Sequence, residues 1–309
     1  DRLAASMRLQ LAAAASVQDF RGKTAFITGG ASGIGLGMAR AFGHAGMNVV
    51  LADIDDKLAQ SVAEKLASEQ IKAVGVRCDV SERASVREAA LEAVAAFGKV
   101  HVVCNNAGVA VGGPIGTVKD KDWDWIIDVN LKGVVYGTET FVPLIKSHGE
   151  GGHIVSTASM AGMIAPPGME PYTATKFAVV AMSEGWAQQL APLNIGVSVL
   201  CPGFVKTRIH ESGRARQDKY GGQGDVDALG NGPSEAAQMV LSGIDPDIVG
   251  RRVLEAVRDN DLYIFTHPMF KDFVAARFAG IMAGFDKAAS SEALKAVKEW
   301  APVGPPRVE

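Results

Sequence analysis

The chain has 309 residues, of which 48% are hydrophobic, and a formal net charge of −3. This length is sufficient for one sizeable core and short for two full domains. The near-neutral balance, without a cluster of Lys or Arg, argues against binding to nucleic acid or to an anionic membrane. Because no apolar run reaches the ~18 residues needed to span a bilayer, we expect no membrane partner.

Residues 1–18 are rich in Ala and lack the basic start and long apolar run of a signal peptide. We expect them to be a tag or a disordered extension that precedes one domain over 19–309. The cysteines Cys78, Cys104 and Cys201 lie in or beside apolar strand-like runs. An odd number without metal-ligand spacing predicts reduced core thiols in a cytoplasmic protein, with no metal site.

Strand-like and helix-like segments alternate along the chain, starting at about residue 23. The expected strands are 23–28, 48–53, 72–78, 100–105, 152–158, 194–201 and 262–265, and the expected helices are 34–45, 56–69, 82–97, 122–147, 172–191 and 246–259. This alternation predicts an α/β fold, a doubly wound (Rossmann-type) parallel seven-stranded sheet with helices on both faces. Ligands of such sheets bind beyond the C-terminal ends of the strands.

Two regions interrupt this alternation. Residues 208–234 are crowded with Gly, Arg, Gln and Asp and have no apolar periodicity. A long segment of this kind predicts a lid or binding loop. Residues 266–309 read as a C-terminal helical extension.

The first expected strand runs into a glycine-rich turn, Gly29-Gly-Ala-Ser-Gly33-Ile-Gly35, and then into a helix. Such a turn brings backbone N–H groups and the positive end of a helix to a pyrophosphate. The glycines permit a tight turn and close approach of the phosphates. The pattern predicts a dinucleotide site.

Asp53 ends the second expected strand. A carboxylate at that place accepts hydrogen bonds from both adenosine-ribose hydroxyls and repels a 2′-phosphate, which favours NAD over NADP. No Lys or Arg occupies Ile54, Asp55 or the glycine turn, where a cation for NADP would be expected. NADP nevertheless stays open as an alternative.

Tyr172 and Lys176 are four positions apart, so on a helix they share a face. A phenol with a pKa near 10 is a poor acid or base at neutral pH, but a close cation stabilises the phenolate. Ser159, thirteen residues before Tyr172, can donate a hydrogen bond to a substrate carbonyl oxygen beside the phenol. These three residues predict acid–base chemistry on an alcohol or ketone.

These motifs, with Asn105-Asn106-Ala107-Gly108 and Pro202-Gly203, resemble the short-chain dehydrogenase/reductase family in its single-domain branch. The resemblance implies hydride transfer between NAD(H) and a secondary alcohol or ketone. It implies the catalytic residues Asn130, Ser159, Tyr172 and Lys176. It implies cofactor contacts at Gly29, Ser32, Gly33, Ile34, Gly35, Asp53, Asp79, Val80, Asn106, Ala107, Gly108, Tyr172, Lys176, Pro202, Gly203, Val205 and Thr207.

Two of these implied roles have a structural alternative. In the family, an Asn such as Asn130 kinks its helix and holds water that connects the Lys176 ammonium to solvent; a helix Asn with purely structural partners is the alternative. An Asp such as Asp79 binds the adenine amino group, but a carboxylate before Ser81-Glu82 is also typical of a helix N-cap.

The distal half, over 209–221 and 243–268, is similar to bacterial dehydrogenases for bulky aromatic alcohols, the Cα-dehydrogenases of β-aryl ethers among them. Residues expected near the substrate are Met160, Met163, Phe204, His210 and Tyr220. The family likeness also implies a homodimer or homotetramer. An NADP(H)-dependent ketoreductase of another substrate class and a non-catalytic dinucleotide-binding sensor are the alternative functions.

Overall fold

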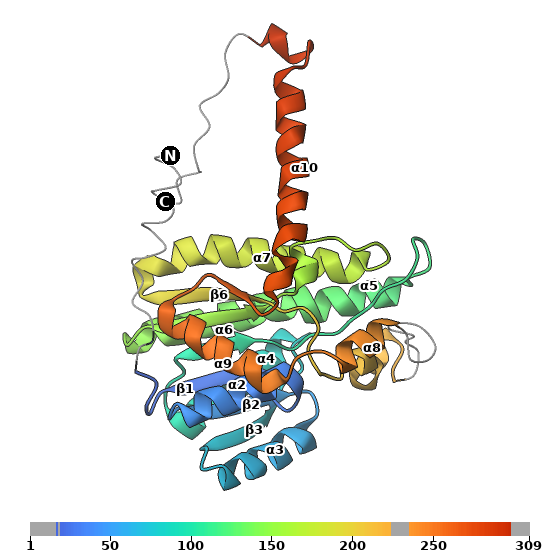
Figure 1. The fold of residues 1–309 in the computed structure, drawn as a ribbon. Helices are drawn as coiled ribbons and strands as arrows, with labels where there is room; N and C mark the ends of the chain where they lie inside the picture. Colours follow the sequence, from blue (N-terminus) through green and yellow to red (C-terminus); the bar gives the residue numbers. More distant parts are fainter. Residues whose placement is uncertain (1–16, 18, 224–234, 298–309) are drawn as a thin grey trace. The chain divides into compact units, whose positions relative to one another are not determined.

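The computed structural model describes residue 17, residues 19–223 and residues 235–297 (Figure 1). The chain divides into two compact units, of which the main one ends at His267 and the second begins at Pro268. The second unit contains the helix α10 (Lys271–Ala289), which falls within the predicted helical extension. The predicted N-terminal extension, except residue 17, and residues 224–234 of the predicted lid lie outside the described residues.

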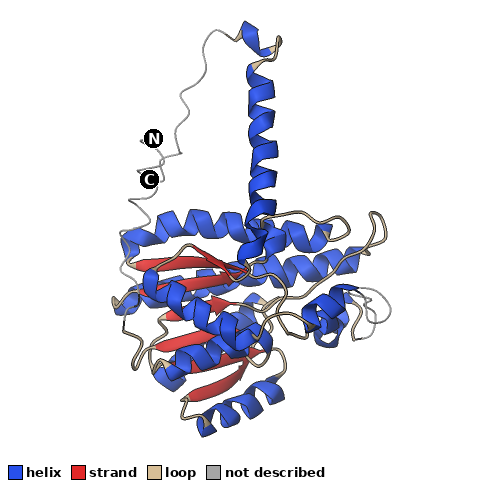
Figure 2. Ribbon diagram, in the orientation of Figure 1, coloured by secondary structure: helices blue, strands red, loops and turns tan. Residues whose placement is uncertain are grey.

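The main unit is built on a parallel sheet of seven strands in the order β3-β2-β1-β4-β5-β6-β7 (Figure 2). The strands are β1 (Thr24–Thr28), β2 (Asn48–Asp53), β3 (Ala73–Arg77), β4 (Val102–Asn105), β5 (Gly152–Thr157), β6 (Ile195–Cys201) and β7 (Tyr263–Phe265). The prediction of a doubly wound parallel sheet is therefore confirmed, and every predicted strand forms within two residues of its expected bounds.

Helices cover both faces of the sheet because successive side chains of each strand point to opposite sides. Ile27 of β1 packs into the core on one face, and Phe26 packs into the core on the other. The first face carries α2 (Gly33–His44), α3 (Asp56–Ser68) and α9 (Pro246–Asp259), and the second carries α4 (Arg83–Phe97), α5 (Asp120–Ile127), α6 (Gly133–His148) and α7 (Glu170–Leu190). A further short helix, α8, spans Glu235–Leu241.

The predicted helix over 122–147 is interrupted in the structure. A π-helical turn, Asp128–Lys132, lies between α5 and α6 and contains Asn130. The Asn130 amide explains the interruption, because it makes hydrogen bonds to the backbone of Val109 on the neighbouring loop. The extra residue of a π turn swings this side chain towards the strand ends, and such turns are frequent at functional sites.

The strand order locates the ligand site. The chain winds outward from β1 to β3 and then returns, so β4 pairs with the other side of β1. Loops after β1 and β4 therefore leave the sheet in opposite directions, and a ligand crevice is expected beyond the C-terminal ends of these two strands. In the part of the chain that the structure describes, no helix combines the length and apolarity that crossing a bilayer requires.

Two glycines let helices α2 and α9 touch backbone to backbone. A Cβ atom at Gly250 would lie 2.0 Å from the carbonyl oxygen of Gly37, and one at Gly37 would lie 2.2 Å from that of Pro246. Both distances are far below van der Waals contact, so neither helix accepts a methyl group without moving. This crossing holds α2, and with it the glycine turn, against the sheet.

We expect Gly250→Ala to destabilise the protein, even though Ala is the better helix former by about 1 kcal/mol. Overpacking a tight contact costs about 1–3 kcal/mol, which outweighs that gain. The free energy of unfolding in urea measures the effect. The matched control is Gly185→Ala in α7, where nothing lies within 4 Å of the added Cβ and stability should stay equal or rise. A Gly250→Ala protein as stable as the wild type would contradict the tight crossing.

Candidate active site

The three residues singled out for acid–base chemistry converge at the ends of β5 and α7. Tyr172 and Lys176 lie on the first turns of α7, and the Lys176 Nζ atom is 5.4 Å from the centre of the Tyr172 ring. Ser159 follows β5 and its side chain is hydrogen-bonded to Tyr172. The Lys176 ammonium donates to the carbonyl oxygen of Thr157 at 2.9 Å, which ties α7 to the end of β5.

Burial dominates the electrostatics of this group. Lys176 is 3% exposed, and burial lowers the pKa of its ammonium to about 8. Burial also raises the pKa of Tyr172 above its ordinary value, while the hydrogen bond from Ser159 acts in the opposite direction. At neutral pH the phenol therefore holds its proton and the ammonium remains charged.

Asn130 and Lys176 meet at Gly108. A Cβ atom at Gly108 would lie 3.4 Å from the Asn130 Oδ1 atom and 3.5 Å from the Lys176 Nζ atom. The Asn130 amide is buried; it accepts from the Val109 N–H at 2.8 Å and donates to the Val109 carbonyl at 2.9 Å. Asn130 thus has structural partners of its own and still lies beside the Lys176 ammonium.

Two other hydroxyl residues, Ser156 and Thr157, lie at the end of β5, and neither is the one beside the phenol. Ser156 is fully buried in β5. Thr157 donates to the Oδ1 atom of Asn106 at 3.2 Å. Ser159 is partly exposed, and its oxygen also accepts from the Ala161 N–H at 3.1 Å. Of the three, Ser159 is the hydroxyl beside the phenol.

The glycine turn connects β1 to α2 in the manner expected of an anion site. Gly33 has a φ of +52°, in the left-handed region that favours glycine. A Cβ at Gly35 would lie 2.1 Å from the carbonyl oxygen of Gly29, so the turn is as tight as the backbone permits. Ser32 is the N-cap residue but makes no side-chain cap bond within the described residues. The N–H groups of Ile34 and its neighbours at the start of α2 can therefore bind a phosphate.

Asp53 lies beside this turn because it follows the residue of β2 that pairs with Thr28. Its Oδ2 atom accepts from the Ala31 N–H and its Oδ1 atom from the Asp55 N–H, both at 3.2 Å. Burial raises the pKa of Asp53, and the guanidinium of Arg214 acts in the opposite direction. A partly exposed carboxylate with spare lone pairs fits the ribose of a dinucleotide.

The loop after β4 closes the other side of the crevice. The side-chain amide of Asn106 donates to the Thr28 carbonyl at 2.9 Å, and the Ala107 N–H donates to the Thr28 hydroxyl at 3.0 Å. Asp79 follows β3 and is 7% exposed, and Val80 after it packs against Gly133. The predicted cofactor residues Asp79, Val80, Asn106 and Ala107 thus lie at the ends of β3 and β4, and the last two are bonded to the end of β1.

Pro202 and Gly203 follow β6. The Pro202 carbonyl accepts from the Met160 N–H at 2.9 Å, and the Gly203 N–H donates to the Nδ1 atom of His267 at 3.2 Å. Because Nδ1 accepts, the Nε2–H of His267 donates to the Phe204 carbonyl at 3.1 Å. His267 therefore holds the loop from both sides. No role at the site was predicted for His267, and its signal in the sequence is limited to its position two residues after the last strand.

The later part of this loop returns to the first glycine turn. Val205 is buried and pairs with Ile244 in a short bridge. A Cβ atom added at Gly33 would lie 2.9 Å from the methyl carbon of Thr207, so the two residues are in close contact. The two predicted cofactor segments, separated by more than 170 residues in the chain, are therefore in contact.

The five residues expected near the substrate have different environments. Met160 and Met163 are buried, Phe204 is 39% exposed, and His210 is partly exposed beside Glu211. Tyr220 is 4% exposed, and its hydroxyl donates to the Oδ2 atom of Asp128 at 2.6 Å. Phe204 is thus the one that offers most surface to a ligand, whereas the Tyr220 hydroxyl already has a partner on the π turn.

A match of the short chain dehydrogenase model covers residues 23–218. A C alpha-dehydrogenase of Sphingobium sp. SYK-6 is 38% identical over 269 residues, which is 86% of this chain and 87% of that protein. Among solved structures, a short chain dehydrogenase/reductase from Burkholderia phymatum in complex with NAD is 35% identical, with a TM-score of 0.80 over 86% of this chain and 96% of that one. The apo form of LigD from Sphingobium sp. SYK-6 is 33% identical, with a TM-score of 0.72 over 86% and 98%.

The family model alone covers well over half of the chain. The Sphingobium C alpha-dehydrogenase, similar over 86% of the chain, supports the same family assignment. The seven-stranded parallel sheet agrees with the fold of these structures. The chain belongs to the short-chain dehydrogenase/reductase family and is an oxidoreductase that acts on CH–OH groups.

Proposed function

We propose that this protein transfers a hydride between NAD(H) and a secondary alcohol or the matching ketone, and that its substrates are bulky or aromatic. The observation that carries the proposal is the convergence of a protonated phenol, a hydroxyl and a buried ammonium at the strand ends: Tyr172, Ser159 and Lys176. A sensor that binds dinucleotide without catalysis has no need to bury a lysine at such a cost.

The residues present fit a nicotinamide dinucleotide. The open N–H groups at the start of α2 suit its pyrophosphate, and the Asp53 carboxylate suits its adenosine ribose. Lys176 is the residue that would hold the nicotinamide ribose. When bound, the cofactor supplies the hydride exchange itself. The related Burkholderia phymatum structure, which contains NAD, supports this choice.

In the reducing direction, Tyr172 is the proton donor. Its raised pKa keeps the phenol protonated at neutral pH, and the Ser159 hydroxyl holds the ketone oxygen next to it. As the proton leaves, the Lys176 ammonium stabilises the phenolate that forms. Oxidation of an alcohol follows the same path in reverse. Asn130, beside the ammonium, would hold a water that connects the Lys176 ammonium to solvent, and the replacement proton would arrive through that water.

Two observations support a bulky or aromatic substrate. The C alpha-dehydrogenase of Sphingobium sp. SYK-6 is similar to this chain over 86% of its length. Phe204, next to Gly203 at the end of β6, leaves 39% of its surface exposed. An exposed ring directly after the cofactor loop can stack on an aromatic alcohol.

Tyr172→Phe keeps the ring and removes the proton carrier. We expect kcat for aryl ketones to fall at least ~10²-fold, the usual loss for a missing general acid, with NADH binding retained. NADH absorbance follows turnover, and fluorescence titration follows binding. The matched control is Tyr263→Phe, which removes a hydroxyl that donates to Glu184 and should keep wild-type kcat. Near-wild-type turnover in Tyr172→Phe would remove this residue from the mechanism.

Lys176→Met tests the cost of burying the ammonium. The pKa of Lys176 is about 8 in the folded protein, against an ordinary value of 10.5. Between these values the unfolded chain binds more protons than the folded one, so this residue makes wild-type stability rise with pH. Relative to Lys176→Met, the wild type should gain up to about 3 kcal/mol between pH 8 and 10.5. Urea unfolding at each pH gives the difference, and a constant difference would contradict the burial argument.

Asp53→Ser tests the choice between NAD and NADP. Loss of the carboxylate removes the repulsion of a 2′-phosphate and leaves the Arg214 guanidinium, which acts on Asp53 in the wild type, free to attract it. We expect kcat/KM for NADPH to rise relative to NADH. In the double variant Asp53→Ser/Arg214→Ala the gain should be smaller. A wild type that already prefers NADPH would overturn our interpretation of Asp53.

A further inference from the structure

A strap crosses the dinucleotide crevice in the main unit. We use the name for residues 208–220, which contain two 3₁₀ turns, Ile209–Ala215 and Asp218–Tyr220. The strap begins directly after Thr207, which contacts the glycine turn at Gly33. Midway, the Ser212 hydroxyl accepts from the Ala110 N–H at 3.1 Å, past the end of β4. It therefore runs over the strand ends from β6 towards β3.

A buried guanidinium anchors the far end of the strap. The Arg216 side chain is fully buried, forms an ion pair with Asp122 at 2.6 Å and lies 5.2 Å above the ring of Trp125. Its Nε and Nη2 atoms also donate to the Tyr220 carbonyl. A buried guanidinium with these partners fixes the position of its neighbours, because moving it away from Asp122 would leave its charge uncompensated.

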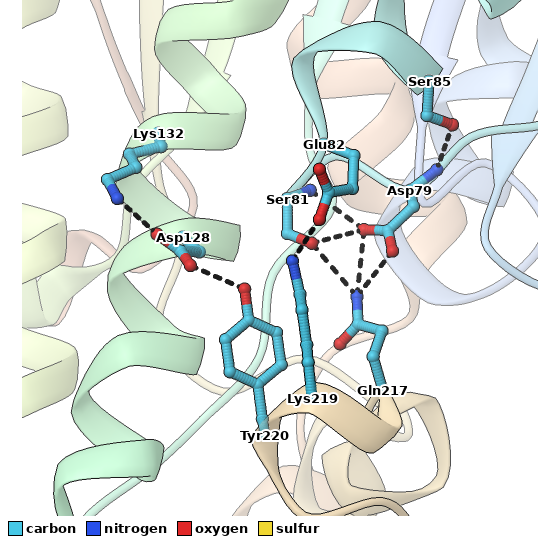
Figure 3. A network of polar contacts seen from close by, with 9 residues as sticks. All are labelled: Asp79, Ser81, Glu82, Ser85, Asp128, Lys132, Gln217, Lys219 and Tyr220. Carbon is cyan, nitrogen blue, oxygen red and sulfur yellow. Dashed lines mark hydrogen bonds and ion pairs between the residues drawn. The ribbon is translucent and has the colours of Figure 1, made fainter.

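Next to this anchor, Gln217 reaches Asp79 (Figure 3). The Gln217 Nε2 atom lies 2.9 Å from both carboxylate oxygens of Asp79 and 3.3 Å from the Ser81 hydroxyl. The Ser81 N–H and hydroxyl both donate to Asp79 Oδ1, at 3.0 and 2.7 Å. Among the described residues, Oδ1 thus accepts from three donors, whereas Oδ2 accepts only from Gln217. Asp79 Oδ2 retains capacity for one more donor.

The other polar atom of the Gln217 amide is its oxygen, Oε1. Its Oε1 atom is buried and accepts no hydrogen bond from the described residues. Exchanging the amide nitrogen and oxygen cannot relieve this, because Oε1 would then face the Asp79 carboxylate, which has no proton to donate. An acceptor that stays buried without a donor is unfavourable and indicates a missing partner. The Gln217 amide therefore places an acceptor without a donor, Oε1, near Asp79 Oδ2, which can accept a further hydrogen bond.

We propose that Gln217 is part of the adenine site: its Oε1 and the Oδ2 of Asp79 accept the two N–H groups of the adenine 6-amino group. Because both acceptors are buried in the described conformation, the dinucleotide enters with the strap raised, and the strap then closes over it. This inference rests on the proposed dinucleotide function and adds to it a residue from the segment that the sequence analysis interpreted as a substrate lid.

The test compares NADH with its deamino analogue, in which a carbonyl replaces the 6-amino group. Fluorescence titration gives the Kd of each without any turnover. A carbonyl facing two acceptors loses both hydrogen bonds, so we expect the wild type to bind NADH about 10- to 100-fold more tightly. Gln217→Met keeps the side-chain length but removes the acceptor, and the preference should fall several-fold. Thermal unfolding verifies that each variant is folded.

Lys219→Met is the matched control. It makes the same replacement in the same strap and breaks the ion pair between Lys219 and Glu82, which lies outside the proposed contact. A strap that acts only as a structural cover would make both variants alike. We expect Lys219→Met to keep the wild-type preference for NADH over the analogue.

Three outcomes would overturn the proposal. One is a wild type that binds both dinucleotides equally. Another is an unchanged preference in Gln217→Met. The third is tighter NADH binding by that variant with a preserved preference, because then the amide competes with adenine for Asp79.

A measurement on the wild type alone gives an independent answer. At equal saturation, NADH should slow amide hydrogen exchange across 208–220 more than the analogue does, and equal protection would contradict the proposal. A wild type that selects NADH in this way but oxidises no secondary alcohol would refute the proposed enzyme activity and support the adenine site.

Discussion

The buried ammonium of Lys176 is the constraint around which the site is organised. A charge in a low-dielectric interior is unfavourable unless partners compensate it. The protein supplies the Thr157 carbonyl at 2.9 Å and the π face of Tyr172. Three elements meet these requirements. β5 ends at Thr157, and α7 carries Tyr172 and Lys176 on one face. Gly108, in the loop after β4, has no side chain and so leaves room for the ammonium. The sheet is what brings these three elements to one point.

The same constraint explains the break between α5 and α6. A continuous helix would keep Asn130 in regular register with its neighbours, whereas the π turn lets its amide bond to Val109 and border the lysine. Each turn of π-helix gives up regular hydrogen bonding, so it persists where a tertiary contact favours it. Here that contact also sets the β4 loop, which in turn holds Gly108 beside the ammonium. The helix irregularity and the buried charge are parts of one arrangement.

Local patterns were sufficient to predict the sheet, because strands buried on both faces read as apolar runs and each is separated from the next by a helix. The glycine turn and the Tyr172–Lys176 pair were predictable for a similar reason: their geometry depends on residues close in sequence. The contacts of 208–220 were not, because Gln217 and Asp79 are 138 residues apart and the strap has no periodicity of its own. The contact of His267 was not predictable either, because its partner Gly203 lies 64 residues away in the chain. Long-range polar contacts have no signal in the residues between them.

The acid–base group and the strap are anchored in different ways, and this difference bears on their proposed roles. The acid–base group is held by strand ends and a long helix, so it resists change. The strap is held by a few polar contacts, Arg216 to Asp122 and Tyr220 to Asp128 among them. Because it touches the crevice at several strand ends without carrying the proton, its sequence can vary without altering the chemistry of Tyr172. In the proposed function, specificity for the dinucleotide and for the alcohol can therefore change in the strap while the proposed acid–base group stays constant.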